Sequence, residues 1–504
     1  MLVSKIMCGI LLVQSKDFIP LSLHLQAFDK LRNRGPNFDR YQYRNNIFIG
    51  QTVLHITGSD AYYHQDHKNF LAYNGEIYNF KQFGNYSNDI EFVHDAVEHN
   101  LDQLKQGWGA WAWAWTDGTT VRYASDPQGE KCLFRYQDND ILIVSSEVAP
   151  ILTYITANKV PQDYETRHWC MIADTPYQGI SRISPGYLYQ SDSDPIVIDS
   201  LWSWIQPVTY DSIDQAQEEF NSIWKTVTKL TRPACPAALT YSGGLDTGII
   251  LSHIPGLELY TTNMVGKDPI VDRIKDFLTQ DEQSRLHCFR VDPESWGRAF
   301  DQVIARTQMP VQSWSFVGQW IINANCQQQV LFTGIGADEL FGGYDVYQRL
   351  EYTTEYSASP YSYRGDSALW GRCLQAYGQD PKQATLLMDY FYQIVGCDQR
   401  GVDLIAGQWG IESRNPFLAA PVIKFALNLP IEYKIGSVPK PLIRNLYLQR
   451  WDATQVLPKK GFSGHCNDSL PWINVDITAS GNRDRDWRQI VLDSFYTGSN
   501  QPVC

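Results

Sequence analysis

The segment Ser242-Gly243-Gly244-Leu245-Asp246-Thr247 follows a short apolar run and precedes a helical-looking one. A strand, a glycine-rich turn and a helix in this order can hold an anion. Glycines let the backbone come close, and amide N–H groups at the helix start point at the anion. The hydroxyls of Ser242 and Thr247 add donors, and Asp246 can hold a divalent cation against phosphate oxygens. The pattern predicts phosphate binding, with a plain glycine-rich turn as the alternative.

This loop lacks the lysine of the phosphate loops that serve γ-phosphate cleavage. It resembles the SGGxDS pyrophosphate loop of ATP pyrophosphatases, which transfer AMP to a carboxylate or carbonyl oxygen. The resemblance implies ATP as a substrate and Mg²⁺ as its companion ion. It also implies a set of ATP-binding residues in the loop: Ser242, Gly243, Gly244, Asp246 and Thr247.

A second reactive group lies near the start of the chain, in Met7-Cys8-Gly9-Ile10. A cysteine that becomes residue one of the mature chain has its own α-amine beside the thiol. That amine titrates near ~7.7–8.0 and can act as the general base. The interpretation requires either that Met7 is the true start or that a short propeptide is removed. An ordinary buried cysteine is the alternative.

Five further blocks accompany Cys8: Arg34-Gly35-Pro36-Asn37, Tyr73–Asn79, Asn88–Glu91, Ser125–Lys131 and Ser145–Glu147. Together they resemble the class II glutamine amidotransferases, whose nucleophile is an N-terminal cysteine. The resemblance implies that Cys8 attacks the glutamine amide, and that Asn74 and Gly75 donate to the oxyanion that amide hydrolysis forms. Glu76 and Asp89 would receive the ammonium group of glutamine. For Asn74-Gly75, a type I′ hairpin turn is the alternative.

One position departs from that pattern. The family usually places an arginine shortly before an L-S-I run, where it holds the glutamine α-carboxylate. The equivalent run here is Leu54-His55-Ile56, and Val53 precedes it. Without the guanidinium, glutamine loses a bidentate partner. We expect either another basic group in its place or weak glutamine affinity.

The stretch Leu331–Tyr344 contains Thr333-Gly334-Ile335-Gly336-Ala337-Asp338-Glu339. It resembles the SGEGSDEVFGGY block of asparagine synthetases. The resemblance implies that Thr333 and Gly334 touch the adenine-ribose side of ATP. Asp338 would be the second metal ligand, so that Asp246 and Asp338 hold Mg²⁺ against the pyrophosphate. A helix start capped by Asp338 is the alternative.

Ile335 replaces the first glutamate of that block. In asparagine synthetases this carboxylate lies near the acyl-adenylate, and isoleucine cannot accept a proton. Either another base such as Glu339 serves, or the acceptor is not aspartate.

Three later blocks, Trp409–Leu418, Lys440–Arg444 and Pro458–Phe462, resemble the same family in the expected order. The resemblance implies that Lys440 and one of Lys459 or Lys460 neutralise departing pyrophosphate. It also assigns Arg414, with Glu339, to the acceptor site.

The elements that must position these residues fall into two groups. Residues 8 to about 195 alternate apolar and polar residues between turn signals, with a helix suggested over Leu21–Leu31. We predict an α+β N-terminal-nucleophile sandwich of antiparallel sheets with helices, forming a glutaminase domain over residues 8–195. The strands are expected within three runs: Ile47–Leu54, Ala110–Trp115 and Ile141–Val144.

Beyond a polar link, strand-like and helical runs alternate, which predicts a parallel sheet with helices on both faces. The expected strands are Ala237–Tyr241, Leu257–Thr262, Leu286–Val291 and Val330–Thr333, and helices are expected after Asp246 and over Asp272–Leu278, Trp296–Ala305 and Phe316–Asn325. We assign residues 212–504 to an α/β ATP-pyrophosphatase domain. Ligands of such sheets bind at the carboxyl ends of strands, where Ser242–Thr247 lies.

The composition and net charge of the chain limit the classes of partner that we expect it to bind. The chain has 504 residues and a net charge of -13, which argues against nucleic-acid binding through a basic face. No apolar run approaches the ~20 residues needed to cross a bilayer. The ten cysteines include no C-x-x-C pair, which favours reduced thiols in a cytoplasmic protein. We expect small-molecule partners (glutamine, ATP, and aspartate or another carboxylate) and allow for a homodimer.

These observations predict a glutamine-hydrolysing asparagine synthetase or a close homologue. Two alternatives remain open. The first is the same adenylating chemistry on another carboxylate, forming an amide or a lactam, which Ile335 and Val53 motivate. The second is a degraded nucleotide-binding regulatory homologue, against which the intact Cys8, Asp246 and Asp338 argue.

Overall fold

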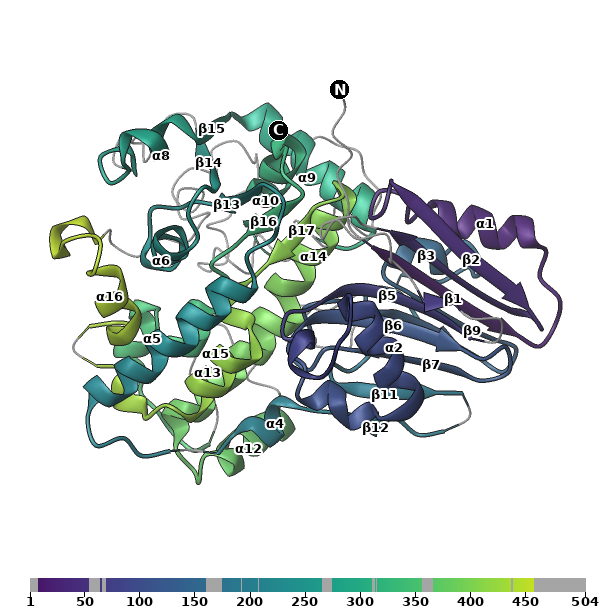
Figure 1. Cartoon of the computed structure of the whole chain (residues 1–504), viewed down its shortest axis with the longest axis horizontal. Coiled ribbons are helices and arrows are strands. Elements are labelled where there is room, and N and C mark those ends of the chain that lie inside the picture. The colour runs from purple at the N-terminus through teal and green to yellow at the C-terminus, as the bar shows by residue number, and fades with distance from the viewer. Residues whose placement is uncertain are drawn as a thin grey trace.

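A computed structural model of the chain describes residues 8–53, 64–65, 69–159, 175–191, 193–206, 208–264, 274–310, 313, 315–355, 366–436 and 438–456. Two antiparallel six-stranded sheets make up the first part of the chain (Figure 1). Across the first sheet the strands are β10 (Ile180–Arg182), β8 (Phe134–Gln137), β9 (Ile141–Ser145), β1 (Gly9–Ser15), β3 (Ile47–Val53) and β2 (Phe38–Arg44). Across the second they are β12 (Ile196–Val197), β11 (Tyr187–Gln190), β7 (Val121–Ser125), β6 (Gly109–Thr116), β5 (Phe70–Ile77) and β4 (His64–Gln65).

The two sheets stack face to face, because alternate residues of their strands enter one shared apolar core. Ile10 of β1 packs there with Phe70 of β5 and Ala112 of β6. Leu11 of β1 points the other way, into a core shared with α1 (Leu21–Asp29) and α3 (Val148–Ile151). The outer face of the second sheet is covered by α2 (Asp89–His99). The predicted antiparallel sandwich with helices is confirmed.

Strand β6 shows how the alternation assigns side chains to layers. Ala112 and Ala114 face the neighbouring sheet, where the two sheets approach closely. Trp111 and Trp113 face α2 and fill the wider space between helix and sheet. All four side chains are buried, so the strand lies between two apolar layers.

The second part of the chain is built on a five-stranded parallel sheet. Its order is β15 (Leu286–Val291), β14 (Glu258–Met264), β13 (Ala237–Thr240), β16 (Val330–Phe332) and β17 (Glu412–Arg414). Four of these strands were predicted, and the parallel arrangement is confirmed. The edge strand β17 was not predicted, because three residues are too few to show a period.

Helices cover both faces of this sheet (Figure 1). The helices described in this part of the chain are α4 (Leu201–Trp204), α5 (Ile213–Leu230), α6 (Leu245–His253), α8 (Gln280–Ser284), α9 (Pro293–Thr307), α10 (Ser315–Asn325), α11 (Ala337–Phe341), α12 (Ser367–Ala376), α13 (Pro381–Asp389), α14 (Gln399–Gln408), α15 (Ala420–Asn428) and α16 (Pro441–Tyr447). A π-helix, η4 (Tyr390–Asp398), joins α13 to α14. The remaining short 3₁₀ turns are η1 (Phe80–Gln82), η2 (Leu101–Lys105), η3 (Asp345–Gln348), η5 (Pro416–Leu418), η6 (Ile431–Tyr433) and η7 (Ala453–Gln455).

The expected helices after Asp246 and near Trp296 and Phe316 are present as α6, α9 and α10. The one expected over Asp272–Leu278 begins outside the described residues. Strand β12 pairs with β11, so the second sheet continues two residues past the predicted domain end at 195. Within the described ranges, no helix combines the length and the apolar character needed to cross a membrane.

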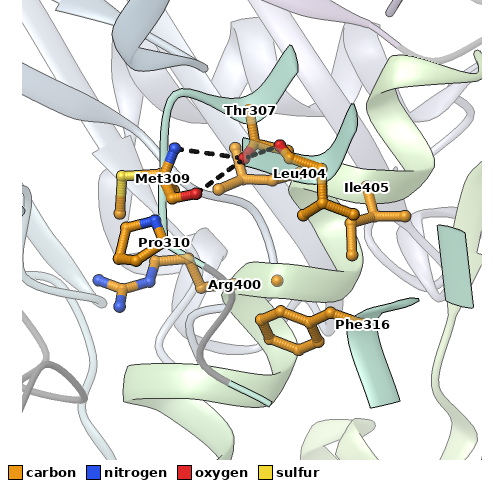
Figure 2. A pocket seen from close by; sticks show the side chains of 9 residues that line it. Thr307, Met309, Pro310, Phe316, Arg400, Leu404 and Ile405 are labelled. Atoms are coloured by element: carbon orange, nitrogen blue, oxygen red, sulfur yellow. Dashed lines mark hydrogen bonds between the residues drawn. The ribbon is translucent and has the colours of Figure 1, made fainter. Parts of the chain in front are cut away.

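Helix α14 lies at the junction of the two parts and crosses α10 at close range. A Cβ on Gly401 of α14 would lie 1.9 Å from Cζ of Phe316. A cavity of only about 10 Å³ remains beside this contact, enough for one water at most. Figure 2 shows Phe316 of α10 with Leu404 and Ile405 of α14 around it. The missing side chain at 401 is therefore what allows the two helices to approach.

We expect Gly401→Ala to destabilise the protein by about 1–3 kcal/mol, because overpacking forces buried groups to shift. Gly371→Ala in α12 is the matched control, since a Cβ there meets no atom within 4 Å. That control is expected to stabilise slightly, by about 0.4–1 kcal/mol. Chemical unfolding of both variants measures the difference. Equal midpoints for the two variants would show that the crossing is not tightly packed.

Candidate active site

Cys8 lies immediately before β1, at the edge of the sandwich that faces the second part of the chain. Its side chain packs against the large apolar cluster formed by residues from Leu201 onward. Its sulfur lies 3.9 Å from Nε2 of Gln51, and its carbonyl accepts a hydrogen bond of 3.1 Å from Nε of Arg34. The Gln51 amide also bonds both backbone groups of Tyr73, so it connects the Cys8 strand to β5.

Asn74 and Gly75 lie inside β5, paired with Ala112 and Trp111 of β6. The alternative of a hairpin turn at this pair is therefore wrong, because the pairing continues on both sides. The Asn74 side chain is buried, and its Nδ2 has no hydrogen-bond partner among the described residues. A buried, unpaired donor is costly unless a ligand accepts from it. This geometry fits the predicted oxyanion donor.

Gly75 adopts a φ of +136°, a region that side chains rarely enter. A Cβ at this position would lie 2.0 Å from the Ala110 carbonyl oxygen. Only glycine fits here, because both the backbone angle and the approach of β6 exclude a side chain.

The two carboxylates predicted to receive the glutamine ammonium are both close to this strand. Asp89, the first residue of α2, accepts hydrogen bonds from the Tyr73 hydroxyl (2.9 Å) and the Ile77 amide (3.0 Å). Burial raises its pKa to about 6. Burial also raises the pKa of Glu76 to about 8, although the nearby Arg414 guanidinium acts in the opposite direction. Each carboxyl is therefore poised to ionise when a cationic ligand approaches.

Val53, the last residue of β3, is buried. The Leu54-His55-Ile56 run that follows lies outside the described residues, and no basic substitute for the missing arginine can be placed there. What binds the glutamine carboxylate stays a prediction.

The glycine-rich loop Ser242–Thr247 joins β13 to α6, as predicted. Gly243 has a φ of +73°, and Gly244 precedes the first turn of α6. The Ser242 and Thr247 hydroxyls lie 3.1 Å apart, and Ser242 Oγ also accepts from the Gly244 amide. Strand, tight turn and helix are thus arranged as an anion site requires.

Asp246 and Asp338 come from different strand ends and converge on one cation, the Lys440 ammonium. Lys440 Nζ lies 2.5 Å from Oδ1 of Asp246 and 2.6 Å from Oδ1 of Asp338. Lys440 has a left-handed φ of 52°, which is unfavourable for a residue with a side chain. A Cβ on Gly343 would lie 1.9 Å from Cε of Lys440 and 2.0 Å from Asp338 Oδ1. Glycine at 343 is what leaves room for this contact.

The same two carboxylates fit Mg²⁺, which proteins commonly hold with one or two carboxylates, waters and substrate phosphates. No cluster of three or more metal-binding side chains occurs in the described part of the chain. The donor set therefore suits an ion brought in with a nucleotide better than a closed protein cage. Asp338 is inside the short helix α11, which does not require it as a cap.

Thr333 and Gly334 follow β16 and adjoin the same loop. A Cβ on Gly334 would lie 3.0 Å from Cβ of Asp246. The Thr333 hydroxyl donates a 2.5 Å hydrogen bond to the Asn415 side chain. Lys459 and Lys460 lie outside the described residues, so only Lys440 of the predicted pyrophosphate-binding lysines can be placed.

Glu339 follows Asp338 in α11 and is buried. It accepts a 2.6 Å hydrogen bond from the Tyr344 hydroxyl. Burial, and then repulsion from Asp338, raises the pKa of Glu339 to about 8. A carboxyl with that pKa can exchange a proton near neutral pH, as a general base must. Ile335 is partly buried and packs against the apolar core.

The assignment of Arg414 to the acceptor site stays a prediction, and the structure shows what its guanidinium contacts. Its guanidinium pairs with Glu76 of β5 at 2.5 Å and with Glu412 at 2.7 Å, and it also donates to the Thr231 carbonyl. Its partners come from both parts of the chain, so it contributes to the contact between them. The structure shows no contact between Arg414 and Glu339 among the described residues.

Sequence reasoning missed most of the buried polar groups that join the two halves. Arg34 bonds Glu147 (3.2 Å) in its own half and Asp403 of α14 (2.9 Å) in the other. Lys131 also pairs with Asp403, and Gln408 of α14 donates to Glu147. A single carboxylate in the apolar run Gly401–Ile405 was the signal available, because an isolated charge in such a run needs a partner.

A second connection reaches the nucleotide loop. Asn415 donates to Glu130 of the first half at 2.9 Å, while its oxygen accepts from Thr333. Burial, followed by repulsion from Asp126, raises the pKa of Glu130 to about 8. One buried amide thus connects the amidotransferase-like half to the carboxyl end of the parallel sheet.

We expect Arg34→Met to destabilise the protein by about 3–5 kcal/mol, because Glu147 and Asp403 would remain buried with less compensation. Arg298→Met is the matched control, since Arg298 pairs with Glu294 on the exposed side of α9. The Arg298→Met variant should lose far less stability than Arg34→Met. Chemical unfolding with fluorescence detection measures both. Similar losses of stability in the two variants would contradict a stabilising role for the buried ion pairs of Arg34.

The comparisons with known proteins divide the chain in the same way. Residues 7–202 match the family model of a glutamine amidotransferase domain. Residues 225–463 match the family model of asparagine synthase.

Among curated proteins, asparagine synthetase [glutamine-hydrolyzing] 1 of Saccharomyces cerevisiae is 22% identical over 474 residues, which cover 84% of this chain and 77% of that protein. The protein of the same name from Bacillus subtilis is 22% identical, with 68% of this chain and 60% of its own length covered. Amidase chyE of Penicillium rubens is 21% identical, and the alignment covers 64% of this chain and 55% of that protein. The chain thus spans less than two thirds of the length of the last two relatives.

A solved structure, an allosteric regulatory enzyme of purine biosynthesis, shares 15% identity. The alignment covers 46% of this chain and 60% of that one, with a TM-score of 0.29, too low to carry an argument. The two family models, in the order that the sandwich and the parallel sheet follow, carry the assignment. The chain belongs to the asparagine synthetase family and combines a glutamine amidotransferase domain with an asparagine synthase domain.

Proposed function

We propose that this protein is a glutamine-dependent asparagine synthetase, which converts ATP, aspartate and glutamine into asparagine, AMP, pyrophosphate and glutamate. The observation that carries the proposal is the ion pair that joins the strand beside Cys8 to the sheet that holds the glycine-rich loop. Glu76 beside the Cys8 centre pairs with Arg414, and Arg414 lies on the strand next to β16, whose end holds Thr333.

In the first centre, the Cys8 thiolate attacks the glutamine carboxamide after the α-amine of Cys8 takes the thiol proton. The Asn74 side chain and the Gly75 amide donate to the oxyanion that forms. Glu76 and Asp89 hold the ammonium group of glutamine. Collapse of the intermediate releases ammonia, and water then frees glutamate from the thioester.

In the second centre, the acceptor carboxylate attacks the α-phosphorus of ATP and pyrophosphate leaves. Asp246 and Asp338 would hold Mg²⁺, which supplies positive charge to the pyrophosphate oxygens when it is bound. Lys440 and one of the two lysines at 459 and 460 add further positive charge. Ammonia then attacks the acyl carbon, AMP leaves, and Glu339 accepts a proton from the attacking nitrogen.

Ammonia must pass between the centres without reaching bulk water, where most of it is protonated and cannot attack. The Cys8 side chain packs against the apolar cluster of the synthase domain, which supports a protected passage on that side. The proposal also requires that the mature chain begin at Cys8, because an amide nitrogen cannot act as the base. Intact-mass analysis of the purified protein measures this directly.

We expect Cys8→Ala to abolish glutamine-dependent amide formation, since the thiol that attacks the glutamine carboxamide is removed. Ammonia-dependent formation should persist, because the second centre is unchanged. Cys288→Ala, at an exposed cysteine of β15, serves as the control and should retain both activities. Product formation with each nitrogen source measures the outcome. Equal loss of the ammonia-dependent activity in Cys8→Ala would contradict the two-site scheme.

The raised pKa values predict how glutamine binding depends on pH. Below a pH of about 6 both Asp89 and Glu76 hold protons and attract the glutamine ammonium weakly. Raising the pH to about 8 ionises Asp89 first and then Glu76, so affinity should rise by roughly tenfold or more. Calorimetric titration of glutamine into the unreactive Cys8→Ala variant at both pH values checks this. A flat profile, or one that falls with pH, would exclude these carboxyls as the ammonium ligands.

The acceptor decides between the main proposal and its nearest alternative. Ile335 stands where asparagine synthetases have a glutamate, which favours a different carboxylate as acceptor. The name of the relative amidase chyE gives this alternative only weak support.

ATP–pyrophosphate exchange should depend on aspartate and should be lost in Asp246→Ala, because the first cation ligand is removed. Exchange with another acid, but not with aspartate, would reject aspartate as the acceptor and support the alternative. A chain that fails to bind Mg·ATP at all would instead be the degraded regulatory homologue.

A further inference from the structure

A cavity of about 240 Å³ lies where the two domains and their linker meet, away from both proposed centres. The amidotransferase domain contributes Tyr187 of β11, and the linker helix α4 contributes Trp202. The synthase domain contributes Leu369 and Arg372 of α12 and Phe391 of η4. Figure 1 shows α4 and α12 side by side to the left of β11 and β12.

The cavity shares no lining residue with either centre. None of the residues of the glycine-rich loop, the Asp246–Lys440–Asp338 cluster or the Cys8 centre lines it. A molecule held there would not reach the nucleotide loop or the Cys8 thiol. The cavity is therefore a separate site with respect to glutamine, ATP and the acceptor.

The walls of the cavity are mostly aromatic and aliphatic, with the hydroxyl-bearing Ser184 and Ser200 among the lining residues. The rings of Trp202 and Phe391 stack with centroids 4.9 Å apart. Leu369 and Val395 add aliphatic surface, and the Tyr187 ring completes the wall on the amidotransferase side. Such surfaces favour a flat apolar group, since aromatic rings bury large areas with little loss of conformational freedom.

Arg372 is the one charged residue among the described residues that line the cavity. Its Cζ lies 4.0 Å from the centre of the Trp202 ring, so the indole supports the plane of the guanidinium. In the described part of the chain, no carboxylate lies within ion-pair distance of Arg372. A guanidinium stacked in this way keeps its N–H edges available, and these match a planar carboxylate.

The backbone beside the cavity is unusual and contacts both domains. Phe391 and Val395 belong to the π-helix η4, a conformation that is rare and frequently located at functional sites. The Val395 carbonyl accepts a hydrogen bond from Arg182 of the amidotransferase domain. This wall of the cavity is therefore held by a contact across the domain junction.

We propose that this cavity binds a small aromatic monocarboxylate. Its ring packs on the apolar walls, and its carboxylate faces the guanidinium of Arg372. One net positive charge in the lining argues for one negative charge on the ligand, and the flat walls argue for an aromatic ring. The site is distinct from the acceptor site of the proposed function, and its test does not depend on that function.

The probes are 3-phenylpropanoate and its neutral amide, 3-phenylpropanamide, titrated by calorimetry into the full chain. The acid should bind the wild type. Arg372→Gln should lower the affinity for the acid by roughly tenfold or more. The amide should bind weakly and equally to both proteins. Arg298→Gln, at an exposed arginine on α9, is the control for general charge effects and should leave binding of the acid unchanged.

Leu369→Trp fills the cavity without altering Arg372 and should also remove binding of the acid. Absence of acid binding to the wild type would overturn the proposal, as would equal binding of acid and amide or an unchanged affinity in Arg372→Gln. ATP–pyrophosphate exchange driven by 3-phenylpropanoate and lost in Arg372→Gln would also overturn it, because the cavity would then be part of the acceptor site.

Discussion

The arrangement of this protein depends on buried charges that neither domain can neutralise alone. Arg34 and Arg414 are both at most 2% exposed, and each guanidinium is paired with carboxylates from both domains. Separating the domains would leave Glu147, Asp403 or Glu76 short of a partner in a dry environment, which is strongly unfavourable. The domain junction is therefore selective for one relative placement, in a way that apolar packing alone would not be.

That placement brings the two chemistries together. Arg34 holds the carbonyl of Cys8 with one nitrogen and the synthase helix α14 with another. Asn415 connects Glu130 of the amidotransferase domain to Thr333 at the end of β16. The groups that join the domains are thus direct neighbours of the groups assigned to catalysis, and a change in one centre has a short physical route to the other.

At both centres, a glycine allows neighbouring groups to approach more closely than a residue with a side chain would permit. Gly75 lets β5 approach β6 beside the Asn74 amide nitrogen, which has no hydrogen-bond partner among the described residues, and Gly343 lets Lys440 reach Asp338. Lys440 itself has a left-handed backbone conformation. Backbone strain and missing side chains of this kind mark places where geometry is retained for function rather than for stability.

The sequence by itself determined the elements and the order of the two domains. The two-residue period of β6, the helical run of α9 and the glycine-rich turn after β13 are local features, and local sterics and burial decide them. The motif residues of both centres could be named for the same reason, because a family pattern is a pattern of neighbours along the chain.

Only the tertiary structure decided which of those residues meet. Lys440 reaches Asp246 across 194 positions, and Arg414 pairs with Glu76 of the other domain. Asn74-Gly75, a turn by local preference, became part of a strand because β6 offers hydrogen bonds on both sides. The physical reason is that desolvation and ion pairing depend on which surfaces are buried together. Which surfaces are buried together depends on how the two domains are placed relative to one another, and no spacing along the chain encodes that placement.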